Sequence, residues 1–415
     1  MIGLVDGNNF YVSCERIFDL TLENKPVAIL SNNDGCVISR SYEFKALNIP
    51  MGAPYFKLRD HKNIIMRSSN YELYGDISRR LIATLHEFTP DVEQYSIDEA
   101  FIHINRPLGG DYSELGKQIR QTVLQWVGIP CGIGFAQSKT LAKIANHIAK
   151  KESSGVFVMP DDKQSVLDEL HVSEVWGVGK RLAPKLETLG IRTAWQLAIA
   201  DEVFLKKRFN VTLAKTAREL RGESIIEHDD PEVLSQSISC SRSFGKPVIN
   251  FSELTEAVAH YIARATVKLR KEKQRAAGIN VYFQYFPEYK PYKLDGGITS
   301  TTIAFETPTS STSKIISAVT PKLQGIFIKG RRYKKAGVIF FGLESQKNHS
   351  VDLFANNQND EKTDRLSEAV DIINLKFGKG TVFNLAEGIK KPWAMKREML
   401  SPNYTTNWQQ LPKVK

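Results

Sequence analysis

Cysteine is scarce in this chain of 415 residues, and long apolar stretches are missing. The four cysteines are Cys14, Cys36, Cys131 and Cys240, and none belongs to a CxxC or Cys/His pair. Their spacing excludes a common zinc site or a disulfide framework and is typical of reduced cytosolic thiols. No apolar run approaches the roughly 20 residues of a membrane-spanning helix, and no signal-peptide pattern opens the sequence. We therefore expect a cytoplasmic protein without a membrane partner.

Acidic residues are outnumbered, with 46 Asp and Glu against 56 Lys and Arg and a net charge of +10. Such an excess of positive charge suits a polyanionic partner, although mild basicity also aids solubility. The net charge alone does not distinguish these two explanations. The composition, 42% apolar and 25% charged, is that of a globular protein. A chain of this length is expected to divide into several domains.

Three of the acidic residues stand at the end of, or inside, apolar runs. Asp6 closes the run at residues 2–5, and Asp98 and Glu99 interrupt the run at residues 94–102. Carboxylates rarely lie in such surroundings unless a cation compensates them, and a pair of divalent metals is the usual remedy where three converge. Neighbours in a straight strand point to opposite faces, so Asp98 and Glu99 can share a site only at a turn or bulge. Two unrelated acidic turns are the alternative.

The first 160 residues mix strand and helix patterns, which favours an α+β catalytic domain with residues 11–69 inserted into it. A strand is expected within residues 1–10 and a helix over 74–85. Ser113 is the expected cap of another helix, whose inner side would carry Leu115, Ile119, Val123 and Leu124. Residues 127–135 read as an apolar strand.

Residues 161–230 show only short helical patterns, and their glycines indicate a helix-hairpin-helix. Gly177 and Gly179 would let a tight hairpin approach a DNA phosphate, and Lys180 follows at once. An ordinary turn between two helices is the alternative.

Residues 235–345 predict the order β-α-β-β-α-β of a ferredoxin-like sandwich. The expected helices cover 252–274 and 312–328, and the expected strands cover 235–244, 279–285, 301–305 and 336–341. Basic residues recur along the first helix at Arg264, Lys268, Lys271 and Arg275, and Arg331 and Arg332 precede the last strand. Such a face can grip nucleic-acid backbone, while a plain solvated face is the alternative for the stripe alone. In the tail, a helix over 363–376 indicates a small appended module.

Four sequence blocks, in residues 6–15, 35–47, 95–101 and 132–145, resemble those of the Y-family translesion DNA polymerases. The blocks at 31–37, 68–74 and 240–245 resemble the UmuC subfamily, and the likeness covers the whole chain. The resemblance implies a right-hand polymerase. Its palm would be 1–10 and 70–160, its fingers 11–69, its thumb 161–230, its little finger 235–345, and its partner-binding tail 346–415.

The resemblance also implies roles for single residues. Asp6 and Asp98 would bridge two Mg²⁺ ions, with Glu99 and the carbonyl of Gly7 completing the set, and the primer 3′-hydroxyl would attack a dNTP. Tyr11 would be the steric gate against ribose, beside Phe10, which the pattern favours for the core. The triphosphate would meet Ser39, Tyr42 and Lys45 from one helical edge and Lys150 from the other side. Many relatives carry Arg at the position of Lys45.

Further expected contacts concern DNA and protein partners. Primer-template DNA would meet residues Gly177, Gly179, Lys180, Arg242, Arg264, Lys268, Lys271, Arg331 and Arg332. Leu353 and Phe354 close a short motif like those that bind a sliding clamp, although Ser350 replaces the usual Gln; a plain loop is the alternative. A cleaved UmuD dimer and a RecA filament on single-stranded DNA are partners by resemblance alone.

These observations predict an error-prone, DNA-directed DNA polymerase that carries out translesion synthesis in the SOS response. One alternative is a catalytically silent DNA-binding regulator, which would not need three uncompensated acids. A palm-type nucleotidyl cyclase shares the two-metal chemistry but has no use for the two DNA-binding modules.

Overall fold

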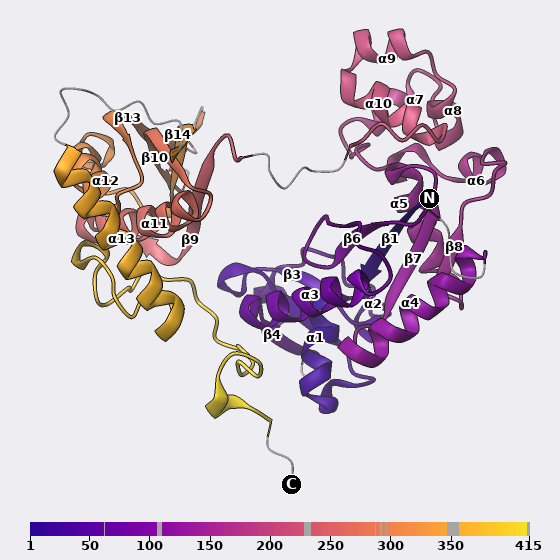
Figure 1. Cartoon of the computed structure of the whole chain (residues 1–415), viewed down its shortest axis with the longest axis horizontal. Coiled ribbons are helices and arrows are strands. Elements are labelled where there is room, and N and C mark those ends of the chain that lie inside the picture. Colours follow the sequence, from indigo (N-terminus) through magenta and orange to yellow (C-terminus); the bar gives the residue numbers. More distant parts are fainter. Residues whose placement is uncertain are drawn as a thin grey trace. The chain divides into compact units, whose positions relative to one another are not determined.

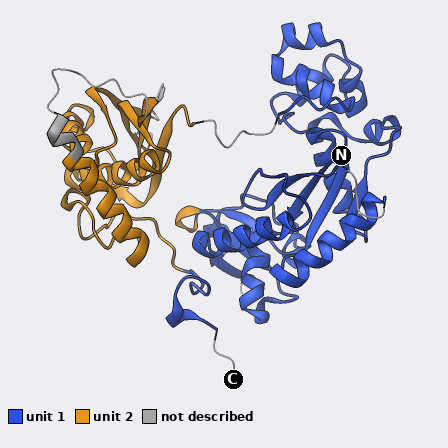
Figure 2. Ribbon diagram, in the orientation of Figure 1, with its two compact units in different colours: residues 1–31, 35–230, 399–415 blue, residues 32–34, 231–398 orange. Residues whose placement is uncertain are grey.

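The computed structural model describes residues 1–61, 63–105, 110–227, 234–286, 288–290, 293–295, 297–346 and 357–412. Two compact units make up the chain, as Figure 2 shows. Unit 1 consists of Met1–Ser31, Gly35–Asp230 and Met399–Lys415, and unit 2 of Asn32–Asp34 and Pro231–Glu398. Within the described ranges, no helix combines the length and the apolarity that crossing a membrane requires.

The centre of unit 1 is a five-stranded sheet in the order β5-β6-β1-β7-β8 (Figure 1). Its strands are β1 (Ile2–Gly7), β5 (Val92–Gln94), β6 (Glu99–His103), β7 (Cys131–Ala136) and β8 (Val156–Val158). The central strand β1 pairs antiparallel with β6 on one side and β7 on the other. Val5 and Ile102 pack into one core and Leu4 and Phe101 into another, because alternate side chains of a strand point to opposite faces.

Three helices cover the two faces of this sheet. They are α3 (Tyr71–His86), α4 (Tyr112–Val127) and α5 (Lys139–Ala149). The buried sides of α3 and α4 share the core of Val5, and α5 shares the core of Leu4. The helix predicted over 74–85 is confirmed as part of α3.

Three details predicted around α4 were wrong. The cap is Asp111, whose carboxylate accepts a hydrogen bond from the Ser113 N–H at 2.8 Å, so the helix begins before Ser113. Leu124 is 54% exposed and does not belong to the inner side. The strand begins at Cys131, not at 127, because Gly128 ends the helix in the left-handed conformation with φ 79°.

A small three-stranded sheet in unit 1 has the order β3-β2-β4. It consists of β2 (Val27–Leu30), β3 (Val37–Arg40) and β4 (Ile65–Ser68), flanked by α1 (Phe10–Phe18) and α2 (Tyr42–Lys45). Phe44 and Leu30 lie in its own small core.

The short helices predicted in 161–230 are confirmed. They are α6 (Gln164–Glu169), α7 (Ala183–Glu187), α8 (Ala194–Ala198), α9 (Glu202–Arg208) and α10 (Val211–Leu220). The buried Glu219 of α10 accepts a hydrogen bond from the Thr140 N–H at 3.0 Å, and its backbone carbonyl accepts from the Ser138 hydroxyl at 2.6 Å. These bonds fasten the helical segment to the first turn of α5.

Unit 2 contains a four-stranded antiparallel sheet in the order β13-β10-β14-β9. The strands are β9 (Ile238–Val248), β10 (Gln274–Tyr285), β13 (Ile298–Thr309) and β14 (Tyr333–Ser345), and a hairpin of β11 (Glu288–Lys290) and β12 (Lys293–Asp295) lies between β10 and β13. With α11 (Phe251–Lys271) and α12 (Thr312–Val319), the predicted order β-α-β-β-α-β is confirmed. The second helix is shorter than predicted, because a 3₁₀ segment (Thr320–Ile326) containing Pro321 replaces its second half.

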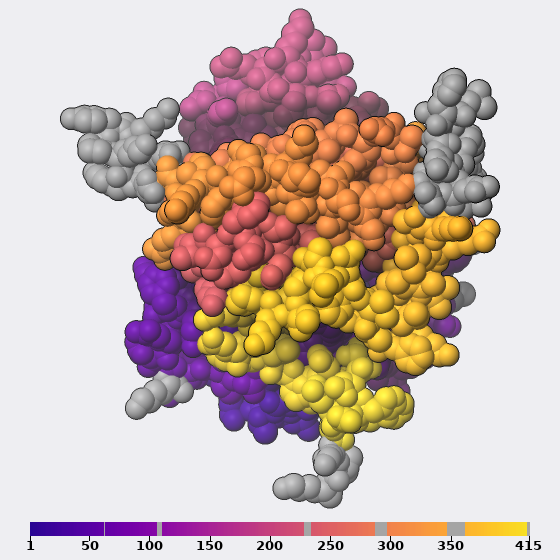
Figure 3. Space-filling model, turned by 90° about the vertical axis from the view of Figure 1, so that its left-hand side faces the viewer, coloured from indigo at the N-terminus to yellow at the C-terminus, as the bar shows by residue number. Residues whose placement is uncertain are grey.

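The C-terminal part of unit 2 packs on α11. Helix α13 (Asn357–Phe377) includes the helix predicted over 363–376, and its Asp371 pairs with Arg270 at 2.6 Å. Farther on, Glu387 contacts His260 at 2.8 Å and Trp393 is buried. Figure 3 shows yellow atoms of the C-terminal part next to the coral part of unit 2.

A glycine at the contact of β7 with α5 provides a test of this packing. A Cβ added to Gly134 would collide with the backbone nitrogen of Asn146. We expect Gly134→Ala to lower the free energy of unfolding by about 3 kcal/mol, because neither backbone can yield. Denaturant unfolding measures the change. The matched variant Gly75→Ala, whose Cβ would meet only the Arg79 guanidinium at 4.0 Å, should instead stabilise α3 by up to about 1 kcal/mol. Equal effects of the two variants would contradict the close approach.

Candidate active site

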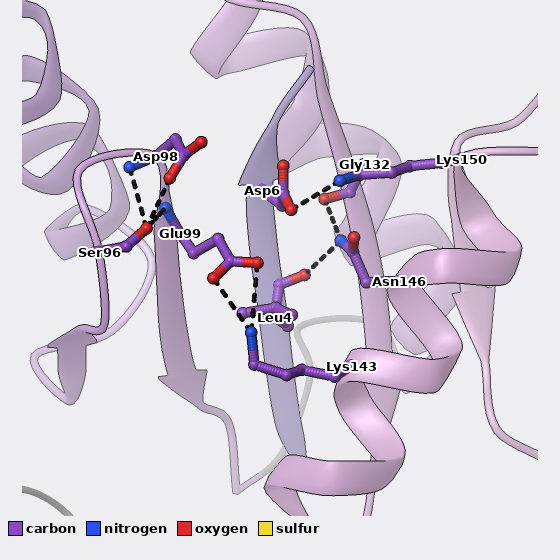
Figure 4. Close-up of polar contacts among 9 residues, drawn as sticks. All are labelled: Leu4, Asp6, Ser96, Asp98, Glu99, Gly132, Lys143, Asn146 and Lys150. Carbon is purple, nitrogen blue, oxygen red and sulfur yellow. Dashed lines mark hydrogen bonds and ion pairs between the residues drawn. The ribbon is translucent and has the colours of Figure 1, made fainter. Parts of the chain in front are cut away.

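The acidic residues singled out in the sequence lie at one end of two adjacent strands (Figure 4). Asp6 on β1 lies opposite Glu99 on β6 in the antiparallel register. Asp98 lies in the turn between β5 and β6, and its carbonyl accepts a hydrogen bond from the Gly7 N–H at 2.9 Å. The Ser96 hydroxyl accepts from the N–H of Glu99 at 3.1 Å and donates to the Asp98 carboxylate at 2.6 Å. Asp98 and Glu99 therefore lie at a turn, which is the placement that two sequence neighbours need in order to share a site.

Helix α5 and the residue after it supply cations to two of these carboxylates. The Lys150 ammonium lies 2.6 Å from the Asp6 carboxylate, and the Lys143 ammonium lies 3.0 Å from that of Glu99. Between them, the Asn146 amide donates to the carbonyl of Leu4 at 3.1 Å and to that of Gly132 at 2.7 Å. Asn146 thereby ties α5 to β1 and β7 directly behind the acidic residues.

The environment of Asp6 shows how strongly positive charge is needed here. The pKa of Asp6 is raised to about 7: burial is the largest cause, the nearby Glu99 carboxylate acts in the same direction, and Lys150 opposes both. A buried carboxylate beside a second one is stable in its charged form only when a cation lies close to both.

The donor set fits a hard divalent cation, although the three acids do not form a finished cluster. Among the residues that the structure describes, no three His, Cys, Asp or Glu side chains lie close enough together to hold a metal ion. Asp98 contacts Ser96, while Asp6 and Glu99 contact lysines. All donors are nevertheless carboxylate oxygens, which Mg²⁺ prefers, and the two ammonium groups mark places where positive charge is already bound.

Tyr11 lies close enough to Asp98 to interact with its charge. Burial raises its pKa, and Asp98 is among the charges that raise it further. Its ring stacks on that of Tyr74, with centroids 4.5 Å apart and an interplanar angle of 15°. Phe10 is 2% exposed, in agreement with its expected place in the core.

The predicted triphosphate residues do not share one helical edge, and that part of the prediction was wrong. Ser39 lies on β3 and is buried, whereas Tyr42 and Lys45 lie on α2. Burial lowers the pKa of Lys45, and the positive charges of Arg40 and Lys150 lower it further, while Asp6 opposes them. Lys45, Lys150 and Asp6 therefore lie close enough to interact, and Arg40 is a further cation that the sequence analysis missed.

Known proteins are similar to this chain over its whole length. Models of the impB/mucB/samB family match residues 5–147, of its C-terminal domain residues 235–353, and of its helix-hairpin-helix motif residues 160–191. The chain is 42% identical to Protein UmuC and 41% identical to Protein SamB, both from Salmonella typhimurium, over 100% of each chain. The chain belongs to the UmuC subfamily of the Y-family translesion DNA polymerases.

More distant comparisons agree with this membership. DNA polymerase IV 1 of Bacillus subtilis is 27% identical over 90% of each chain. A Y-family DNA polymerase chimera of Dbh and Dpo4 shares the fold with a TM-score of 0.66 at 22% identity, covering 83% of this chain and 100% of the chimera. The fold is thus the right hand of a Y-family polymerase with an added C-terminal module, for which residues 364–414 match a domain of unknown function. The relatives give no support to a catalytically silent regulator.

The residues expected to bind DNA are distributed over both units of this Y-family chain. Gly177, Gly179 and Lys180 lie exposed in the turn before α7, and Gly177 has φ 86°. On α11, Arg264, Lys268 and Lys271 are exposed, as is Arg242 on β9. Arg275 does not continue the stripe: it lies on β10 and pairs with Asp364 at 2.6 Å.

The remaining predicted contacts are the arginines that precede β14 and the clamp-binding motif. The Arg331 guanidinium lies 4.9 Å from the Tyr285 ring centroid, and that of Arg332 lies 5.6 Å from the centroid of Phe286. Leu353 and Phe354, predicted to bind a sliding clamp, lie outside the described residues.

Sequence reasoning also missed an aromatic cage around Lys143. Its ammonium lies 4.3 Å from the ring centroid of Tyr95, 5.3 Å from that of Trp176 and 5.9 Å from that of Phe101. Trp176 comes from the hairpin segment, so the cation joins that segment to the acidic end of β6. No signal in the sequence predicts this contact, because it depends on the strand register and on the position of the hairpin in the fold.

Replacing Lys143 by Met tests the contribution of this cation. The substitution keeps the length of the side chain but removes the ion pair with Glu99 and the cation–π contacts. We expect a loss of about 1–2 kcal/mol of folding free energy, because the lysine is partly shielded from water. Urea unfolding measures it, with the exposed Lys151→Met as control. A Lys143→Met variant as stable as that control would contradict the role of the cage.

Proposed function

We propose that this error-prone translesion DNA polymerase transfers nucleotides at the carboxylates of Asp6, Asp98 and Glu99. The observation that carries the proposal is the pairing of Asp6 with Glu99 across β1 and β6, each with a lysine ammonium beside it and with Asp98 in the adjoining turn. Carboxylates in this arrangement serve nucleotidyl transfer better than DNA binding, because DNA is itself an anion.

Membership of the family implies a divalent metal ion and dNTPs, and we propose two Mg²⁺ ions. Asp6 and Asp98 would hold both ions, with Glu99 and the Gly7 carbonyl as further ligands. When bound, such a pair stabilises the attacking and leaving oxygens of an in-line displacement at the α-phosphate. Because Lys143 and Lys150 have flexible stems, their ammonium groups can leave the carboxylates to other cations.

The positive side chains around Asp6 are suited to the triphosphate of the incoming nucleotide. Lys45 and Lys150 interact electrostatically with Asp6 and with each other, and Arg40 adds to the same positive field. Ammonium groups on two different elements can hold phosphate oxygens from two directions. Tyr42, 54% exposed with the Lys45 ammonium 4.8 Å from its ring centroid, adds a phenol, and Ser39 a hydroxyl.

Tyr11 is the proposed steric gate. Its stacked ring next to Asp98 would lie beneath the sugar of the nucleotide, where a ribose 2′-hydroxyl would clash. Such a residue sets substrate choice by exclusion and takes no part in the chemistry.

We assign residues 1–10 and 70–160 to the palm, 11–69 to the fingers, 161–230 to the thumb and 235–345 to the little finger. Primer-template DNA would be held through its phosphates by the exposed glycines and cations of the thumb and little finger. Residues 346–415 would serve partner binding, with a cleaved UmuD dimer, a RecA filament and, through Leu353 and Phe354, a sliding clamp as proposed partners.

Metal binding has a consequence for stability that does not depend on activity. A cation that binds only the folded chain raises the free energy of unfolding by about 1.4 kcal/mol at ten times its dissociation constant. We expect Mg²⁺ or Mn²⁺ to raise the melting temperature of the full chain but not that of Asp6→Asn. The exposed Asp60→Asn serves as control and should respond like the parent. An equal metal response of Asp6→Asn would contradict the assigned ligand.

Primer extension tests the catalytic assignment. With Mg²⁺, dNTPs, a UmuD-derived dimer and activated RecA, the chain should extend a primer across an abasic template. Asp98→Asn should reduce extension by about a hundredfold or more, because a charged ligand proposed to hold the cations that stabilise the transition state is lost. Primer-template binding, measured by fluorescence anisotropy, should survive. No extension by the parent chain under any combination of partners would favour the DNA-binding regulator.

A further inference from the structure

A short C-terminal segment of unit 1, residues 399–404, is held tightly against the elements that carry Tyr11. The backbone of Met399 makes two hydrogen bonds with Ser68. Its carbonyl accepts from the Ser68 N–H at 3.0 Å, and its N–H donates to the Ser68 hydroxyl at 2.9 Å. The Tyr404 ring stacks on that of Phe18, at the end of α1, with centroids 4.9 Å apart. Both anchors place residue 401 between the start of α3 and the inner side of α1.

Ser401 is buried there in a hydrogen-bonded cluster. The Asn70 amide donates to the Ser401 hydroxyl at 3.0 Å and to the carbonyl of Pro402 at 3.2 Å, while its own oxygen caps α3. The Ser401 hydroxyl donates to the Glu15 carboxylate at 3.0 Å. Ser401 is 6% exposed and Asn70 is fully buried, so water does not replace these partners.

The same carboxylate oxygen holds Tyr74. The Tyr74 hydroxyl donates to Glu15 at 2.7 Å, and its ring is fully buried. Burial raises the pKa of Glu15, whereas the hydrogen bonds from Tyr74 and Ser401 lower it. The Ser401 hydroxyl thus stabilises the carboxylate that fixes the position of the Tyr74 ring.

Tyr11 packs directly on this fixed ring. Tyr74 lies parallel to it, and Tyr71 meets its edge with centroids 6.4 Å apart and an interplanar angle of 87°. Glu15 lies four residues after Tyr11 on α1, and Tyr74 four residues after Asn70 at the start of α3. The contacts therefore run without a gap from Ser401 through Glu15 and Tyr74 to Tyr11.

We propose that Ser401 is a positioning residue for Tyr11, so that the C-terminal segment takes part in selecting the sugar of the incoming nucleotide. The proposal rests on Tyr11 being the steric gate. It gives a role to the end of the region that matches a domain of unknown function. A gate rejects a 2′-hydroxyl only as far as it resists displacement, and its resistance comes from the buried ring behind it.

Single-nucleotide incorporation opposite a template base, measured with dNTPs and rNTPs under the primer-extension conditions above, tests the proposal. Ser401→Ala should lower the preference for dNTP over rNTP in kcat/KM about fivefold, an effect typical of one lost hydrogen bond. Thr406→Ala removes an exposed hydroxyl two residues beyond this segment and should leave the preference unchanged. Asn70→Ala, which loosens the segment from α3, should act in the same direction as Ser401→Ala.

Tyr11→Ala in the same assay separates this proposal from the one on which it rests. If Tyr11→Ala leaves the preference unchanged, Tyr11 is not the gate and both proposals fail. If Tyr11→Ala lowers it and Ser401→Ala does not, the gate stands and the role of Ser401 is refuted.

A double-mutant cycle tests the route. In the Tyr11→Ala background, Ser401→Ala should lower the preference no further, because the residue through which it acts is gone. An equal effect in both backgrounds would overturn the proposal. Should Ser401→Ala fail to fold, Glu15→Gln tests the same route, since its amide still accepts a hydrogen bond but carries no charge.

Discussion

Two carboxylates facing each other across β1 and β6 set the main constraint on unit 1. Asp6 and Glu99 repel each other, and the burial of Asp6 makes its charged form costly. Such a pair is stable only where the fold brings positive charge to it. In this chain that charge comes from α5 and the residue after it, so the position of this helix determines whether the acidic end of the sheet can exist.

One face of α5 supplies the positive charge that the acidic residues require. Lys139, Lys143, Asn146 and Lys150 follow each other at intervals of four, three and four residues, which places them in line along a helix. Lys139 is 2% exposed and pairs with Glu93 at 2.6 Å, so a third acid of the same sheet is neutralised by the same face. The close approach at Gly134 and the bonds of Glu219 to the first turn of α5 hold the helix at the required distance.

How much of this structure could be predicted depends on how far apart in the sequence the interacting residues lie. The buried sides of α3 and α11 and the strands β9 and β10 follow from periodicity, because burial repeats at the spacing of the local structure. The acidic residues were predicted from their apolar neighbours. Their partners Lys143 and Lys150, in contrast, could be identified only once the register of three strands was known. Ser39 was misplaced because α2 begins only after its N-terminal cap Ser41, which leaves Ser39 on the preceding strand β3. Ser401 left no local signal at all, since its partner Glu15 lies 386 residues away in the sequence.

The proposed assignment of only residues 11–69 to the fingers gives the buried cluster behind Tyr11 its importance. A pocket rejects a wrong substrate only through the contacts that it makes, and about sixty residues of fingers make few contacts with a nascent base pair. Base selection then depends largely on pairing itself, which is consistent with an error-prone polymerase. Sugar selection cannot use pairing, because deoxyribose and ribose carry the same bases. It requires a rigid obstacle, and a ring with solvent behind it would yield at little cost. If Tyr11 is the gate as proposed, its stacking on a fully buried Tyr74, with Glu15 and Ser401 behind that ring, provides this rigidity.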